Sequence, residues 1–159
     1  MKKSVILTLA GVFILSVVTV GSFGANLRNA ENPIYVSSLT PTSLENVIDP
    51  TVNIPITDQN KETDPNLKKH WDYYLYLEGS LVKQATTFAL HVTANPIEAD
   101  NPVLSYSIPS SNKYAFIDAS KGSGAITFLS PKPAVITISA TDSAAAPSIK
   151  IAIYWNLDG

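Results

Sequence analysis

The sequence predicts an all-β protein in which two sheets pack face to face as a sandwich. Short segments of about five to nine residues are rich in β-branched and aromatic side chains, with apolar and polar residues alternating along them. Clusters of Pro, Ser, Asn, Asp and Gly separate these segments, and no window after residue 24 shows a convincing helical period. The segments span residues 71–77, 86–94, 103–108, 114–118, 125–129, 134–141 and 148–155. Seven strands joined by short loops are typical of a β-sandwich.

Alternation along these strands predicts which side chains form the core. Successive side chains point to opposite faces of a strand, and a sandwich buries one face of each sheet. The segment 86–94 is expected to direct inward Phe88, Leu90 and Val92, and outward Thr87, Ala89, His91 and Thr93. The last segment is expected to direct inward Ile149, Ile151, Ile153 and Trp155, and outward Lys150, Ala152 and Tyr154.

The stretch "KHWDYYLYLEG", residues 69–79, combines four aromatic rings with several ionisable groups. Strand alternation predicts one face that packs in the core, formed by Trp71, Tyr73, Leu75 and Leu77. It predicts a second face that contacts a partner, formed by His70, Asp72, Tyr74 and Tyr76. Tyrosine is favoured at interfaces because it buries a large area and keeps a polar hydroxyl. A register slip of one residue would exchange the two faces.

The segment 26–66 is polar and contains five prolines, which argues against a long helix there. Two short extended pieces are expected within it, at residues 34–39 and 51–56. In the second piece Val52, Ile54 and Ile56 alternate with polar residues and Pro55, and Pro55 restricts the piece to a sheet edge or a strand start. We therefore expect Val52, Ile54 and Ile56 to be a second partner-binding set, able to add a strand to a neighbouring sheet.

The first residues, "MKKSVILTLAGVFILSVVTVGSFGAN", have the design of a secretory signal peptide: a positive start, an apolar run and small residues. Ser22 and Gly24 favour a cut before Ala25, and a cut before Phe23 is the next choice. The apolar run from Val5 to Val20 has 16 residues, short of the roughly 20 that span a bilayer. A retained anchor and a pilin-like packing helix are the alternatives.

Composition narrows the classes of partner and chemistry. The chain has no cysteine, which excludes disulfides, thiolate metal sites and a cysteine nucleophile. Its formal charge is −2, and without Lys2 and Lys3 nine basic residues face 13 acidic ones. A mildly acidic exported domain does not favour nucleic acid or an anionic membrane as partner, because both bind clustered Lys and Arg. After leader cleavage we expect no stable membrane insertion.

The stretch "LSYSIPSSNKYAFIDASKGSGAITFLSPKPAVITISATDS", residues 104–143, resembles bacterial immunoglobulin-like domains of the group 2 type, and also cadherin-like domains. The likeness covers about residues 81–155 and lies in turn and packing positions. It departs from the first family at Pro133-Ala134, where Gly-Thr is usual, and at Tyr106, where a Trp is usual. Most cadherin calcium motifs are missing. The resemblance implies a single immunoglobulin-like antiparallel β-sandwich of about 7–9 strands.

Together these observations predict a signal helix at residues 1–24, a Pro-rich extended segment at 25–66 with one or two short strands, and an immunoglobulin-like sandwich at 67–159. No catalytic motif surrounds either histidine, so we expect no enzyme and no cofactor. A zinc site would need three or four ligands in reach, and the candidates are His70, Asp72 and His91. Calcium would use loop oxygens, and its candidates are Glu98, Asp100, Asn101, Asp118 and Asp142. Solvated strand and loop residues are the simpler interpretation of both sets, so we assign no metal site.

The predicted function is that of a secreted, non-enzymatic structural or adhesive protein of the cell surface, whose partner is a second copy of itself or another surface protein. Strand addition by the N-terminal segment would assemble such copies head to tail into a pilus-like filament. The alternative is a soluble exported module that binds a glycan or small ligand on the exposed aromatic face. An enzyme inhibitor or a chaperone-like periplasmic factor stays open. The expected location is extracellular, at the cell surface or in the periplasm.

Overall fold

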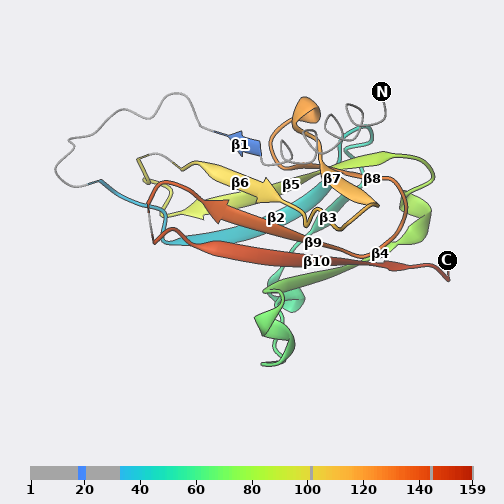
Figure 1. Cartoon of the computed structure of the whole chain (residues 1–159), viewed down its shortest axis with the longest axis horizontal. Helices are drawn as coiled ribbons and strands as arrows, with labels where there is room; N and C mark the ends of the chain where they lie inside the picture. Colours follow the sequence, from blue (N-terminus) through green and yellow to red (C-terminus); the bar gives the residue numbers. More distant parts are fainter. Residues whose placement is uncertain (1–17, 21–32, 101, 144, 159) are drawn as a thin grey trace, which may run out of the picture.

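The protein is an all-β structure with two five-stranded sheets (Figure 1), seen in a computed structural model that describes residues 18–20, 33–100, 102–143 and 145–158. Sheet A has the strand order β1-β6-β9-β10-β4, and sheet B has the order β3-β2-β5-β8-β7. The strands are β1 (Val18–Val20), β2 (Ser38–Asn46), β3 (Asn53–Pro55), β4 (Tyr73–Glu78), β5 (Thr86–Asn95), β6 (Leu104–Ser107), β7 (Ala115–Ile117), β8 (Ala125–Phe128), β9 (Ala134–Ala140) and β10 (Ser148–Asn156). The seven strands predicted from residue 71 onward are confirmed as β4 to β10.

The Pro-rich segment contributes two strands to the sandwich. β2 pairs antiparallel with β5 from Ser38 to Asn46, so the first piece begins later and runs further than the expected 34–39. Pro41 lacks an N–H, and the register shifts between Pro41 and Ser43, which lets the strand continue past the proline. β3 pairs with β2 inside the same chain. β2 and β3 thus belong to sheet B, so this part of the predicted N-terminal extension is built into the sandwich.

The core lies between the sheets and follows the predicted alternation closely. Phe88 and Leu90 of β5 and Ile151 and Ile153 of β10 are buried, while Val92, Ile149 and Trp155 are partly buried against the core. The rings of Phe88 and Phe128 meet edge to face at 6.1 Å. Burying each such side chain contributes about 1.5–3 kcal/mol, so the core holds the fold without disulfides.

Two residues expected to face solvent are buried instead. Thr87 of β5 is 1% exposed because Lys121, in the 3₁₀ turn Ala119–Lys121, donates to its hydroxyl across 2.9 Å. Ala152 of β10 is also buried, in register with Tyr74 of β4 on one side and Val135 of β9 on the other. Alternation gives the direction of a side chain, and loops and larger neighbours decide its exposure.

Sheet A departs from the predicted antiparallel pattern at β4, which pairs parallel with β10 from Tyr73 to Glu78. The chain leaves β4 through a 3₁₀ turn at Gly79–Leu81 and enters β5 in the other sheet. β4 and β5, although consecutive in the chain, therefore lie in different sheets and do not pair with each other. The parallel pairing with β10 places Tyr76 of β4 directly beside Tyr154.

The chain before β2 is fixed to one end of the sandwich. The Asp100 carboxylate accepts a hydrogen bond from the Ile34 N–H at 2.8 Å, and the Asp142 carboxylate accepts one from the Val36 N–H at 2.7 Å. The predicted signal helix lies outside the described residues except at Val18–Val20, which form a strand on the edge of β6 and are not helical. Within the described residues, no helix has the length and apolar character needed to cross a membrane.

Candidate functional site

An open groove lined by aromatic rings lies on the outer face of sheet A. Its volume is about 400 Å³, and we name it the aromatic groove. Its lining combines four aromatic residues with one acid and one leucine: Trp71, Tyr74, Tyr76, Tyr154, Glu62 and Leu67. Sequence reasoning predicted Tyr74 and Tyr76 on an outward face, with Tyr154 near them, and the structure brings these three together.

The register of two parallel strands produces the ladder of tyrosines. Tyr76 and Tyr154 are paired residues of β4 and β10, and their rings stack with centroids 5.4 Å apart and planes at 23°. Tyr74, two residues earlier on β4, meets Tyr76 edge to face at 5.9 Å. Tyr76 is 70% exposed, so most of its ring surface is open to solvent. Leu75 and Leu77, between and after them, are buried in the core, which confirms the predicted register.

Trp71 was predicted to be in the core, and that prediction is wrong. β4 begins only at Tyr73, after a 3₁₀ turn at Leu67–Lys69, so strand alternation does not extend back to Trp71. The indole instead lines the aromatic groove and meets Tyr154 edge to face at 5.9 Å. Its N–H donates to the Glu62 carboxylate at 2.8 Å, which satisfies the polar end of the ring.

Glu62 positions Trp71 and is itself held by the backbone. Its other carboxylate oxygen accepts hydrogen bonds from the N–H groups of Thr63 and Asp64, both at 3.0 Å. These bonds, led by the Asp64 N–H and followed by the Trp71 indole, hold the pKa of Glu62 below its ordinary value. Sequence reasoning missed Glu62 because nothing in the sequence places residue 62 beside residue 71.

The pKa of Tyr154 in the same groove is raised, first by burial and then by the neighbouring Tyr76 and Glu62, so its hydroxyl stays protonated.

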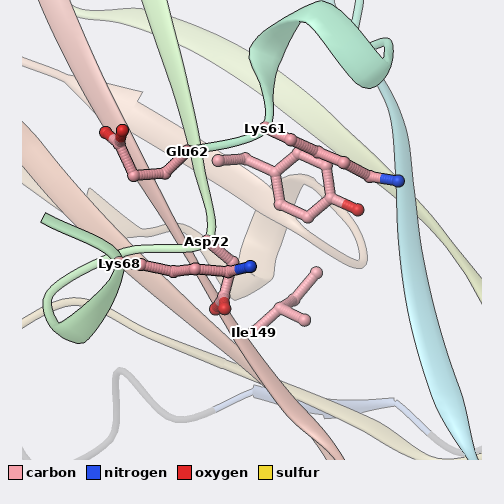
Figure 2. A pocket seen from close by; sticks show the side chains of 6 residues that line it. Lys61, Glu62, Lys68, Asp72 and Ile149 are labelled. Atoms are coloured by element: carbon pink, nitrogen blue, oxygen red, sulfur yellow. The ribbon is translucent and has the colours of Figure 1, made fainter. Parts of the chain in front are cut away.

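A second, charged groove of about 300 Å³ adjoins the first, and Glu62 lines both (Figure 2). Figure 2 shows the Lys68 side chain extended toward the middle of this groove and the Glu62 carboxylate turned away from Lys61. Asp72, predicted to be on the aromatic face, lies here. Its carboxylate accepts from the Lys150 N–H at 2.8 Å and so caps the start of the β4–β10 pairing.

The remaining predicted partner-binding residues lie apart from the aromatic groove or at its rim. His70 is exposed, and its ring centroid is 6.0 Å from that of Trp71. Val52 and Ile54 pack against the core and Ile56 is buried, while β3 pairs with β2 of its own chain. Addition of this segment to a neighbouring copy stays a prediction.

The candidate metal sets are not assembled in the part of the chain that the structure describes. His91 lies on β5, with its Nε2 3.8 Å from the Glu45 carboxylate, while His70 and Asp72 precede β4 of the other sheet. Of the calcium candidates, Asp100 and Asp142 accept backbone N–H groups, Asp118 accepts from Thr127, and Asn101 lies outside the described residues. Among the described residues no group of three or more His, Asp or Glu side chains is placed to hold a metal ion.

Comparisons of the chain with protein-family models, with curated proteins and with solved structures each give no match. The grooves and the sheet edges are therefore the features of the molecule that point to a function.

Proposed function

We propose that the protein is an exported, non-enzymatic, immunoglobulin-like surface protein that acts in adhesion by binding a glycan in the aromatic groove. The observation that supports this most directly is the stacked pair of Tyr76 and Tyr154, in which Tyr76 is exposed and Tyr154 also meets Trp71 edge to face. Large aromatic residues are among the strongest contributors to binding surfaces, and four lie here in one groove.

The chemistry of the groove matches a sugar, which presents both an apolar C–H face and a rim of hydroxyls. The rings of Tyr76 and Trp71 offer flat apolar surfaces, and the tyrosine hydroxyls both donate and accept hydrogen bonds. The Glu62 carboxylate already accepts three hydrogen bonds, so most of its acceptor capacity is used within the protein. The tyrosine hydroxyls are thus the main polar contacts for a ligand.

Binding fits this groove better than hydrolysis of the bound glycan. Glycoside hydrolysis generally needs a pair of carboxyl groups about 5–10 Å apart, one of them protonated as the acid. The described lining of the aromatic groove contains a single carboxylate, Glu62, and its lowered pKa keeps it ionised. A general acid with a raised pKa is the opposite of what this environment produces.

The test is a glycan array probed with the mature chain, residues 25–159, followed by calorimetric titration of any hit. We expect Tyr76→Ala to weaken binding about 30-fold, which corresponds to a hot-spot loss of about 2 kcal/mol. The matched control is Tyr114→Ala, because Tyr114 is also an exposed tyrosine, at 47%, but does not line the aromatic groove. An array without hits, or equal loss in the two variants, would contradict the proposal.

A second candidate function is self-assembly of the chain. The geometry does not favour the segment 52–56 as the donor strand, because its removal from β2 would expose Ile56 and the inner sides of Val52 and Ile54. The observation that favours assembly lies at the other edge of the sandwich, where β1 covers β6.

A further inference from the structure

The edges of the two sheets are protected to different degrees. At the β4 edge, the backbone of Lys61 forms an isolated antiparallel β-bridge with Tyr73, and the Asn60 side chain donates to the Tyr74 carbonyl at 3.2 Å. In sheet B the edge strands β3 and β7 are three residues long, and β3 ends in Pro55. Short edges and prolines are common ways to prevent strand addition. The β6 edge is covered by β1, a strand from the predicted leader.

The backbone of β6 presents a ready hydrogen-bonding edge. Thr141, the residue directly after β9, donates its N–H to the carbonyl of Val103, the residue directly before β6, at 2.9 Å. The carbonyl of Val103 therefore points toward β9. Because backbone groups alternate in direction along a strand, the N–H and C=O groups of Leu104 and Tyr106 point away from β9. These are the residues opposite Val20 and Val18 in the antiparallel β1–β6 register. An added strand would therefore exchange hydrogen bonds with Leu104 and Tyr106.

Cleavage of the predicted leader removes the strand that covers this edge. Both expected cuts, before Phe23 and before Ala25, come after Val20, so either one removes β1 entirely. The side chain of Tyr106 is buried in the core, so what the loss of β1 leaves unpaired is the backbone of β6. Unpaired backbone groups at a sheet edge are a template for another strand. The mature chain thus has an open acceptor edge at Leu104–Ser107.

We propose that this β6 edge accepts an antiparallel strand from a second copy of the chain, supplied by that copy's residues 25–33. Nine residues extend over about 30 Å, and they end next to Ile34, which Asp100 fixes to its own sandwich. Donor and acceptor are different surfaces, so the contact is head to tail and builds a filament or a closed ring. The proposal is independent of glycan binding and names a different donor from residues 52–56.

The first test separates backbone pairing from side-chain packing. Leu104→Pro removes an N–H that faces the edge and leaves the β6–β9 hydrogen bonds intact. Leu104→Ala also removes the leucine side chain but keeps that N–H. Sedimentation of the mature chain, residues 25–159, should show concentration-dependent oligomers for the wild type and Leu104→Ala, and monomers for Leu104→Pro. Both variants should keep a cooperative thermal transition. A wild type that stays monomeric at roughly 500 μM, where even a weak contact would be populated, would overturn the proposal, and so would equal assembly of the two variants.

The second test identifies the donor and does not depend on the proline variant folding. The chain has no native cysteine, so single cysteines report one contact each. Ser105 lies opposite Thr19 at a non-hydrogen-bonded position, where Cα atoms are about 4.5 Å apart and a disulfide can form. Mature Ser105→Cys is mixed with a second chain carrying one cysteine at each position from 26 to 32. We expect heterodimers at alternating positions. A cross-linking yield no higher than with Tyr114→Cys in place of Ser105→Cys would overturn the assignment of residues 25–33 as donor.

Discussion

The outward-pointing side chains of the two sheets differ in exposure: some on sheet B are buried, whereas Tyr76 on sheet A is exposed. On sheet B, Thr87 and Thr127 are almost fully buried and share a hydrogen bond at 2.8 Å, with Lys121 donating to Thr87 and Asp118 accepting from Thr127. On sheet A, Tyr76 stands 70% exposed above an open groove. Both faces obey the same alternation. A face is free for a partner only where the chain's own turns leave it uncovered.

The largest expected difference lies between adjacent residues of β4. Leu75→Ala removes a buried leucine and should lower the free energy of unfolding by about 2–5 kcal/mol. Tyr76→Ala should lower it by only about 0.5–1.5 kcal/mol, the range of an aromatic pair, because the ring is exposed. Urea denaturation of both variants measures this difference. A larger loss for Tyr76→Ala than for Leu75→Ala would mean that the register of β4 is shifted by one residue, and equal losses would contradict the expected difference.

A smaller loss is expected when the turn that closes sheet B is disturbed. Asp118→Ala removes an acceptor for the Ser120 N–H and for the Thr127 hydroxyl, and should cost about 1–3 kcal/mol. Asp158→Ala, at an exposed carboxylate near the end of β10, is the control and should change stability by less than about 0.5 kcal/mol. Thermal unfolding with the two variants in parallel checks this, and equal transition temperatures would contradict it.

The buried threonine pair should show measurable coupling. In a double-mutant cycle with Thr87→Val and Thr127→Val, we expect a coupling free energy of at least about 0.5 kcal/mol, because each single change leaves a buried hydroxyl with fewer partners. The exposed pair Ser139 and Ser148, with hydroxyls 2.9 Å apart, is the reference and should couple much less when each is changed to Ala. If the losses in free energy of unfolding of the two single variants add up to that of the double variant, Thr87 and Thr127 are not coupled, and the prediction is wrong.

The smallest effect is a local response of the aromatic groove to pH. The fold lowers the pKa of Glu62, so the stabilisation is complete above the ordinary value of 4.5 and is lost as pH falls through the lower folded value. In a Trp155→Phe background, Trp71 fluorescence should stay constant above the ordinary pKa of 4.5 and change as the pH falls through the lower pKa of the folded state. Adding Glu62→Gln should remove this acid response. An unchanged response in that variant would mean that another group titrates beside Trp71.

Much of the fold follows from local patterns in the sequence. The strands from β4 to β10 were predictable because β-branched and aromatic runs lie between clear turn signals, and alternation placed Leu75, Leu77, Phe88 and Leu90 in the core. The outward direction of Tyr74 and Tyr76 was predictable for the same reason. Trp71 was misplaced because a 3₁₀ turn, which strand periodicity does not detect, ends just before it.

Other features needed the tertiary structure. The parallel pairing of β4 with β10 joins residues far apart in the chain, and only that pairing stacks Tyr76 on Tyr154. The hydrogen bond from Trp71 to Glu62 and the sealing of Thr87 by Lys121 are likewise contacts that no local pattern specifies.

The sequence by itself determined the strands from β4 to β10 and most of the faces they present, and it predicted the candidate leader, because backbone alternation and residue propensity are local properties. The tertiary structure decided which outward face stays open, which acid orients the tryptophan and which sheet edge is covered by β1 alone. Those outcomes depend on which distant segments come together, and the free energy of such contacts is set by packing and hydrogen bonding across the whole fold.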